Sequence, residues 1–260
     1  MLLSPPEEGS GACPAGMVHV EGAMVDDGGM QGWRADSAEA AQRSACSVWI
    51  DRTYPERCLS FDPGRWAALR DSYPRRAMSF CVDRYEWPNK SGAYPWVMVT
   101  WPEARDLCSR VGKRLCTEDE WTFACEGEDA TPFPYGYERR SSECGLDAPW
   151  RKYSSSALAA RGSERCSAEL GRLWQGKRSG SSPSCASSWG VEDMNGSVEE
   201  WTVSTRGGTH PSILKGGYWG PVRTRCRTST RSHGPGHAFY QQGFRCCKDI
   251  ASGPRRSVDD

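Results

Sequence analysis

The side chains that could do chemistry gather in the last quarter of the chain, between Gly190 and Cys247. Carboxylates occur in GVEDMNGSVEEWT, and basic residues follow in ILKGGYWGPVRTRCRTSTRSHG. Guanidinium groups bind carboxylates through paired hydrogen bonds, so these arginines could either hold an acidic ligand or pair with nearby carboxylates. We expect mainly structural pairing for them, and they are Arg223, Arg225, Arg227, Arg231 and Arg245.

Histidine and nucleophile motifs are sparse. His233 and His237 have the spacing of paired metal ligands on a helix. The Gly-Pro-Gly between them excludes such a helix, so we expect two loop histidines beside a pocket. The sequence has no GxSxG nucleophile turn, no GxxxxGK[ST] phosphate loop and no HExxH zinc motif.

Thirteen cysteines are spread along the chain rather than paired as CxxC. This pattern favours disulfides over zinc ribbons and predicts an extracytoplasmic protein, periplasmic or secreted, with at least one unpaired thiol. No signal peptide is visible in MLLSPPEEGSGAC, which has neither a basic start nor an apolar core. Cys46 and Cys58 bracket a loop of about a dozen residues, and a bridge there would contribute roughly 3 kcal/mol.

Charge and hydrophobicity exclude two classes of partner. Lysine plus arginine equals aspartate plus glutamate, at 33 each, so no overall field attracts nucleic acid or an anionic membrane. No apolar run approaches the roughly 20 residues that cross a bilayer. The abundance of Gly, Pro and Trp predicts a loop-rich fold that is held together by aromatic side chains.

Only a few regular elements are indicated. Strands are expected near residues 17–20 and over 78–89. Thr100 with Glu103, and Thr117 with Glu120, fit capping boxes that start helices ending at Gly112 and Gly127. We expect a polar surface excursion over residues 28–43, and a possible helical face formed by Trp66, Leu69 and Tyr73. Residues 128–188 should be mostly loop, with one short helix within 158–173.

Six ordered motifs carry a family resemblance: GKRLCTEDEWTFACEG, PYG, DMNGSVEEW, LKGGYW, RTRCR and GFRC. Together they resemble the sulfatase-modifying factor family, whose best-known member is the formylglycine-generating enzyme. The resemblance implies an irregular α+β fold related to C-type lectins, with little regular secondary structure. It implies one domain over residues 13–249, with a family-variable insertion at 28–76. We expect residues 1–12 and 250–260 to be disordered.

The resemblance also implies disulfides and a metal. By position, Cys108 would pair with Cys246, and Cys125 with Cys226. We add Cys13–Cys81 and Cys144–Cys185 as further guesses. The family's calcium ligands match Asp193, Gly196, Val198 and Glu200, which would offer two carboxylates and two backbone carbonyls, although an ordinary solvated acidic turn remains open. A second family calcium site, near Cys144–Gly145, lacks its expected asparagine and is not predicted.

The family's copper site is missing. Its oxidase binds copper(I) through two cysteines after a glycine pair, but no cysteine lies between Gly217 and Cys226. Cys247 is an extra thiol outside this segment, and the histidine-bearing domain of the iron-dependent relatives is absent. We therefore predict neither copper nor iron. Tyr218 replaces the family's serine, and Glu199 its tryptophan. The pocket candidates are Glu199, Tyr218, Trp219, Arg223 and His233.

Two functions remain possible. In the first, the chain is an exported, calcium-stabilised binding or interaction module whose ligand, a peptide, a protein or a small molecule, is unknown. In the second, it is an oxidoreductase or another enzyme that modifies a peptide side chain with a remodelled active site. The shortened segment without thiols favours the first function, and the retained pocket frame keeps the second open.

Overall fold

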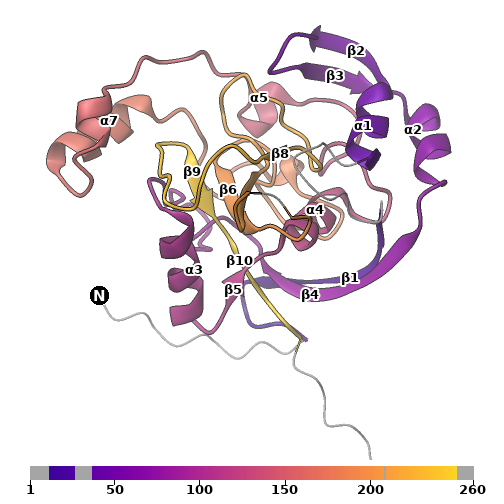
Figure 1. Ribbon diagram of the computed structural model, residues 1–260, viewed down its shortest axis with the longest axis horizontal. Helices are drawn as coiled ribbons and strands as arrows, with labels where there is room; N and C mark the ends of the chain where they lie inside the picture. Colours follow the sequence, from indigo (N-terminus) through magenta and orange to yellow (C-terminus); the bar gives the residue numbers. More distant parts are fainter. Residues whose placement is uncertain (1–11, 27–36, 208, 251–260) are drawn as a thin grey trace, which may run out of the picture.

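The computed structural model describes residues 12–26, 37–207 and 209–250, and its elements are short (Figure 1). The termini that we expected to be disordered fall almost wholly outside the described residues. The helices are α1 (Ser37–Ser44), α2 (Pro63–Arg70), α3 (Trp101–Arg110), α4 (Glu118–Glu126), α5 (Ser141–Cys144), α6 (Ser155–Leu158), α7 (Glu164–Leu173) and the 3₁₀ turn η1 (Pro183–Cys185). The strands are β1 (Met17–Val25), β2 (Cys46–Asp51), β3 (Arg57–Phe61), β4 (Arg75–Asp83), β5 (Arg114–Leu115), β6 (Glu199–Val203), β7 (Ser212–Lys215), β8 (Ser229–Thr230), β9 (Gln242–Phe244) and β10 (Cys246–Lys248).

The first sheet has the strand order β1-β4-β10-β5, and its long antiparallel pair β1–β4 curves along one side of the molecule (Figure 1). Both strands that the sequence predicted are present. The second ends at Asp83 rather than Asn89, because the chain turns there and Asn89 donates its N–H to the carbonyl of Glu86. Val20 and Val82 enter the core from this sheet.

Both predicted capping boxes are confirmed. Thr100 begins α3 and Thr117 begins α4. In each helix the threonine hydroxyl accepts the backbone N–H of the glutamate three residues later, and the carboxylate of that glutamate accepts the backbone N–H of the threonine. Gly127 ends α4 with a positive φ of 66°, which a side chain would strain. Nearly all of α4 is buried, so it forms the centre of the core rather than a surface helix.

The second sheet has the order β8-β7-β6-β9 and carries the acidic motif. Strand β6 pairs antiparallel with β7 and parallel with β9. Because side chains alternate across a strand, Glu199 and Glu200 point to opposite faces of this sheet. The motif thus supplies one carboxylate to each face.

All thirteen cysteines lie in the described part of the chain, and six disulfides join twelve of them. Five are the pairs that we predicted: Cys13–Cys81, Cys46–Cys58, Cys108–Cys246, Cys125–Cys226 and Cys144–Cys185. The sixth corrects the sequence analysis. Cys247, which we took for an extra thiol, bonds Cys116, because adjacent residues in β10 face opposite ways and each meets a different cysteine. Cys166 is the free cysteine, and it is buried.

The segment before β4 is more regular than expected. The predicted excursion over 28–43 lies partly outside the described residues, but Ser37–Ser44 forms α1. Its Ala38 and Ala41 pack with Trp66 of α2, since alanines three residues apart share a helical face. Strands β2 and β3 form a separate hairpin (Figure 1). The helix expected within 158–173 is α7, Glu164–Leu173, and the sequence analysis missed the single turn α6, Ser155–Leu158, that precedes it.

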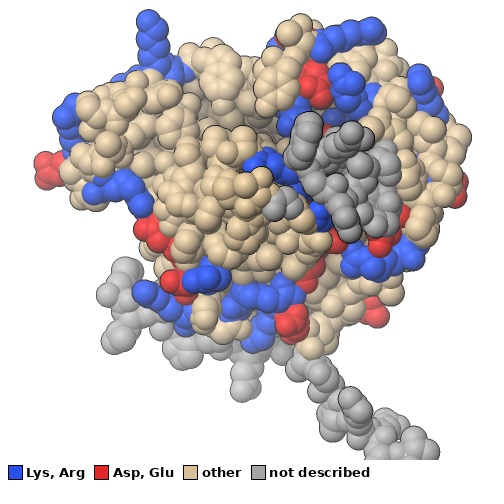
Figure 2. Space-filling view, in the orientation of Figure 1, with Lys and Arg blue, Asp and Glu red and all other residues tan. Residues whose placement is uncertain are grey.

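No described helix combines the length and hydrophobicity that a bilayer span requires. Figure 2 shows basic and acidic side chains interspersed along the lower edge of the visible face. No broad field of one charge sign therefore covers that edge, in agreement with the balanced composition.

Candidate functional site

A small polar cavity lies where β6, β7 and β8 meet the loop of the β2–β3 hairpin. Its volume is about 180 Å³, and it brings together four of the five predicted pocket residues: Glu199, Tyr218, Arg223 and His233. Gly216 and Gly217 turn the chain at its base with φ values of 87° and 67°. A Cβ on Gly216 would lie 2.7 Å from the carbonyl oxygen of Met194, so glycine is required for this close approach.

Glu199 is the buried carboxyl group of this cavity. One of its oxygens, Oε1, accepts a hydrogen bond from the Thr230 hydroxyl at 2.5 Å. Burial raises the pKa of Glu199 to about 7, although Thr230 and the charge of Arg223 favour its ionised form. Among the described residues, no cation lies within ion-pair distance of Glu199 and no hydrogen-bond donor reaches its second oxygen.

The other predicted pocket residues have different roles. Arg223 lies over the ring of Tyr54 at 5.2 Å, and its nearest carboxylate is that of Glu39 at 3.9 Å. Burial and the neighbouring His237 lower the pKa of His233, which favours its neutral form. Trp219 does not line the cavity. It is buried and packs against Trp174, with ring centroids 4.7 Å apart.

Sequence reasoning missed three contributors to the cavity: Tyr54, Thr230 and Gln241. The side-chain oxygen of Gln241 is buried and has no hydrogen-bond partner in the part of the chain that the structure describes. The cysteines that bracket the hairpin loop gave a signal for its rigidity, but nothing in the sequence indicated that its Tyr54 would reach this cavity. An open cleft of about 620 Å³ adjoins the cavity through Tyr218 and Gln241, and aromatic rings, Trp150, Tyr153, Phe239 and Tyr240, line it.

The remaining arginines of the C-terminal segment pair with carboxylates, as expected. Arg227 binds Glu126 through two hydrogen bonds of 2.7 and 2.8 Å, and Arg231 pairs with Glu118. Arg245 binds both oxygens of Glu200 at 2.7 Å. These buried pairs leave Arg223 as the arginine of this set that lines the polar cavity.

The acidic turn before β6 is rich in buried oxygen atoms. Asp193 accepts the N–H of Gly180 at 2.7 Å, and burial raises the pKa of Asp193 to about 6. Burial, together with the charges of Asp193 and Glu200, raises the pKa of Glu86. Among the described residues, one oxygen of Glu86 and the side-chain oxygen of Asn195 have no hydrogen-bond partner. This region therefore has more buried side-chain oxygens than the single guanidinium group of Arg245 can pair with. Such oxygens are the ligands that a hard cation prefers.

The predicted ligand set fits calcium only in part. Asp193 and the turn at Gly196 lie in this region, and Gly196 packs closely on the carbonyl of Cys144. Glu200, however, is engaged by Arg245 and by the indole N–H of Trp121, so a calcium ion would have to share it. In the described parts of the chain, no three His, Cys, Asp or Glu side chains form a ready metal cluster.

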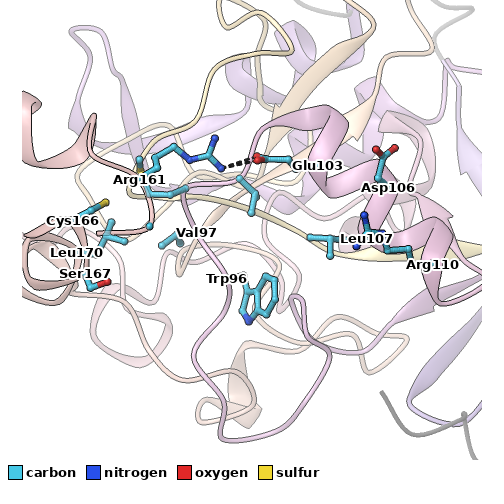
Figure 3. A pocket seen from close by; sticks show the side chains of 13 residues that line it. Trp96, Val97, Glu103, Asp106, Leu107, Arg110, Arg161, Cys166, Ser167 and Leu170 are labelled. Atoms are coloured by element: carbon cyan, nitrogen blue, oxygen red, sulfur yellow. Dashed lines mark hydrogen bonds and ion pairs between the residues drawn. The ribbon is translucent and has the colours of Figure 1, made fainter. Parts of the chain in front are cut away.

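A second cavity, of about 450 Å³, lies between α3 and the α6–α7 segment (Figure 3). Val97, Leu107 and Leu170 give it apolar walls. An ion pair between Arg161 and Glu103, at 2.7 Å, spans the two sides. The free thiol of Cys166 also lines it, far along the chain from the glycine pair. No pattern in the sequence indicated this cavity.

The irregular α+β fold, its long-range disulfides and its pocket at a glycine pair define a protein of the formylglycine-generating-enzyme fold class. The sequence profile described as "Sulfatase-modifying factor enzyme 1-like domain" matches residues 23–250. The chain therefore belongs to the sulfatase-modifying factor family.

Two curated relatives carry the name "Inactive C-alpha-formylglycine-generating enzyme 2". The Bos taurus protein is 30% identical over 213 residues, covering 72% of this chain and 65% of the relative. The Mus musculus protein is 31% identical over 166 residues, covering 58% of this chain and 48% of the relative. The chain thus spans less than two thirds of either relative. The structure of PvdO from Pseudomonas aeruginosa superposes with a TM-score of 0.51 at 15% identity, covering 95% of this chain and 100% of PvdO, which shows the fold alone.

Proposed function

We propose that this protein is an exported, calcium-stabilised binding module that does not generate formylglycine. The observation that carries this proposal is the cavity beside the glycine pair, which holds Glu199, Arg223 and aromatic rings but no thiol. Copper(I) chemistry of the family type needs two adjacent thiolates. Here twelve cysteines are in disulfides, and Cys166 lies in a different cavity.

Three further observations support the proposal. The curated relatives are themselves named inactive, which favours loss of the oxidase activity in this branch of the family. Six disulfides favour an oxidising compartment and hence export. The buried oxygens around Asp193 favour a bound Ca²⁺, which would be held by Asp193 and by the carbonyls of Gly196 and Val198, with Glu200 shared with Arg245.

The second candidate is an enzyme that modifies a peptide side chain. The aromatic cleft that continues from the polar cavity could receive such a substrate, and the cavity contains a buried carboxyl group and a histidine. Metal analysis distinguishes the two candidates: calcium alone supports the binding module, whereas stoichiometric copper or iron supports the enzyme.

The test compares the protein with Asp193→Asn, since asparagine tolerates the positive φ of 59° at this position. Calcium at about a hundred times its Kd should stabilise the native protein by about 2.7 kcal/mol. Asp193→Asn should remove that stabilisation, and the exposed control Asp106→Asn should keep it.

With cysteine-containing peptides, oxygen uptake should equal the blank. An aldehyde product would overturn the proposal.

A further inference from the structure

Glu199 is the feature of the polar cavity that an ordinary folded core does not explain. Its carboxyl group is buried among the residues that line the cavity. Thr230 satisfies one oxygen, and no cation of the described residues lies within ion-pair distance, although the charge of Arg223 favours the ionised form. A buried carboxylate without a cation costs several kcal/mol. Two other buried carboxylates, Glu126 and Glu200, each pair with an arginine.

The cavity has a negatively charged group at one end and a positively charged group at the other. Glu199 supplies a negative group at its buried end, whereas Arg223 supplies a positive group beside Tyr54. Arg223 is only loosely engaged, with Glu39 at 3.9 Å and the carbonyl of Ser229 at 3.3 Å. The neighbouring ring of Tyr218 can face a cation. A ligand with an ammonium group and a nearby anion would satisfy both ends.

The size of the cavity limits that ligand. Its volume of about 180 Å³ is below the roughly 300–1,000 Å³ of typical drug-sized sites. Tyr218 and Gln241 also line the aromatic cleft, so the cavity opens toward apolar rings. A small head group would therefore fit beside Glu199, and an apolar side chain could extend toward the rings of that cleft.

We propose that this cavity binds the ammonium group of an amino acid at Glu199 and its carboxylate at Arg223, with an apolar side chain directed toward the aromatic cleft. This inference rests on the proposed binding function and names its ligand class. The same ammonium chemistry is present in a free amino acid and at a polypeptide N-terminus. In a peptide, however, the first residue has an amide in place of the carboxylate, so Arg223 contributes less.

The test uses calorimetric titration with L-phenylalanine, L-leucine and L-alanine, and with the N-acetyl and amide derivatives of each. N-acetylation should abolish binding, and the amide should bind more weakly. Glu199→Gln should weaken binding roughly 10- to 100-fold, because a charge-assisted hydrogen bond is lost. Arg223→Met should weaken binding of the free acid about 10-fold and leave the amide unchanged, since the two changes remove the same contact. Glu143→Gln, on an exposed side chain, is the matched control and should bind normally.

The outcomes distinguish a free amino acid from a polypeptide N-terminus as the ligand. Binding of tripeptides with a free N-terminus, but not of free amino acids, would overturn the carboxylate contact at Arg223 and assign the ammonium contact at Glu199 to a polypeptide end. Binding that survives N-acetylation or Glu199→Gln, or no binding by any of these amines, would overturn the inference. If Glu199→Gln does not fold, the Arg223→Met comparison of acid with amide still decides. Calcium stabilisation and oxygen uptake are measured on the same samples, so a failure here is distinguishable from a failure of the proposed function.

Discussion

At the scale of single residues, paired charges determine which parts of the fold are rigid. Asp147 is an example, because it accepts hydrogen bonds from Arg139, Ser141 and Arg57. Burial opposes the ionisation of Asp147, but hydrogen bonds from Arg139 outweigh it, with Ser141 and Arg57 contributing, and lower its pKa. One carboxylate thereby ties β3 to the segment that precedes the aromatic cleft.

This arrangement predicts acid sensitivity. Asp147→Asn keeps the positive φ of 61° but removes the charge, and should lower the free energy of unfolding at neutral pH by roughly 2 kcal/mol. Because the folded pKa of Asp147 is depressed, its stabilisation is present above the unfolded pKa of about 3.9 and is lost as the pH falls through the folded value. The difference between the two proteins should therefore shrink below about pH 4. Urea titrations at several pH values measure this difference in the free energy of unfolding. A difference that does not change with pH would contradict the predicted acid sensitivity.

A matched control is Asp71→Asn, whose carboxylate pairs with Arg70 on the surface and is 63% exposed. Exposed pairs contribute about 0–1 kcal/mol, so this variant should change stability little at any pH.

At the scale of elements, the β2–β3 hairpin carries Tyr54 to the polar cavity. It stands apart from both four-stranded sheets, and the bridge Cys46–Cys58 closes it. The hairpin loop therefore forms one side of the polar cavity, and the hairpin contributes little to the central core.

Replacing Cys46 and Cys58 together by serine should destabilise the β2–β3 hairpin without destabilising the first sheet. The bridge spans 12 residues and contributes roughly 3 kcal/mol. Amide exchange should accelerate in β2 and β3 and stay slow in β4. The control pair, Cys144→Ser with Cys185→Ser, should leave hairpin exchange unchanged. Equal acceleration in β4 would show that the hairpin is not an independent unit.

At the scale of the whole molecule, three disulfides join the middle of the chain to its C-terminal part. Cys108–Cys246, Cys116–Cys247 and Cys125–Cys226 span 138, 131 and 101 residues. Cys108 fastens α3 to β10, Cys116 fastens the residue after β5 to β10, and Cys125 fastens α4 to the segment that follows the glycine pair. A fold with such short strands depends on these links to keep both sheets in place.

Reduction should therefore unfold the domain. Each long bridge contributes about 4–5 kcal/mol, and domains have only about 5–15 kcal/mol in total. Cys116→Ser with Cys247→Ser should lower stability by about 4–5 kcal/mol in guanidinium titrations, more than the loss of the short Cys46–Cys58 bridge. A fully reduced protein that retains its cooperative thermal transition would contradict this prediction.

The structure confirmed two disulfide pairs that were guesses, Cys13–Cys81 and Cys144–Cys185. The sequence by itself determined the family, both capped helices, three further disulfide pairs and the residue types around the glycine pair. These follow from local signals, such as a threonine followed by a glutamate three residues later, or from motifs in a fixed order. Only the tertiary structure decided that Cys247 meets Cys116, that Arg245 engages Glu200, and that Tyr54 joins Glu199 in one cavity. Such contacts join residues far apart in the chain, and their partners are selected by packing, which no local pattern encodes.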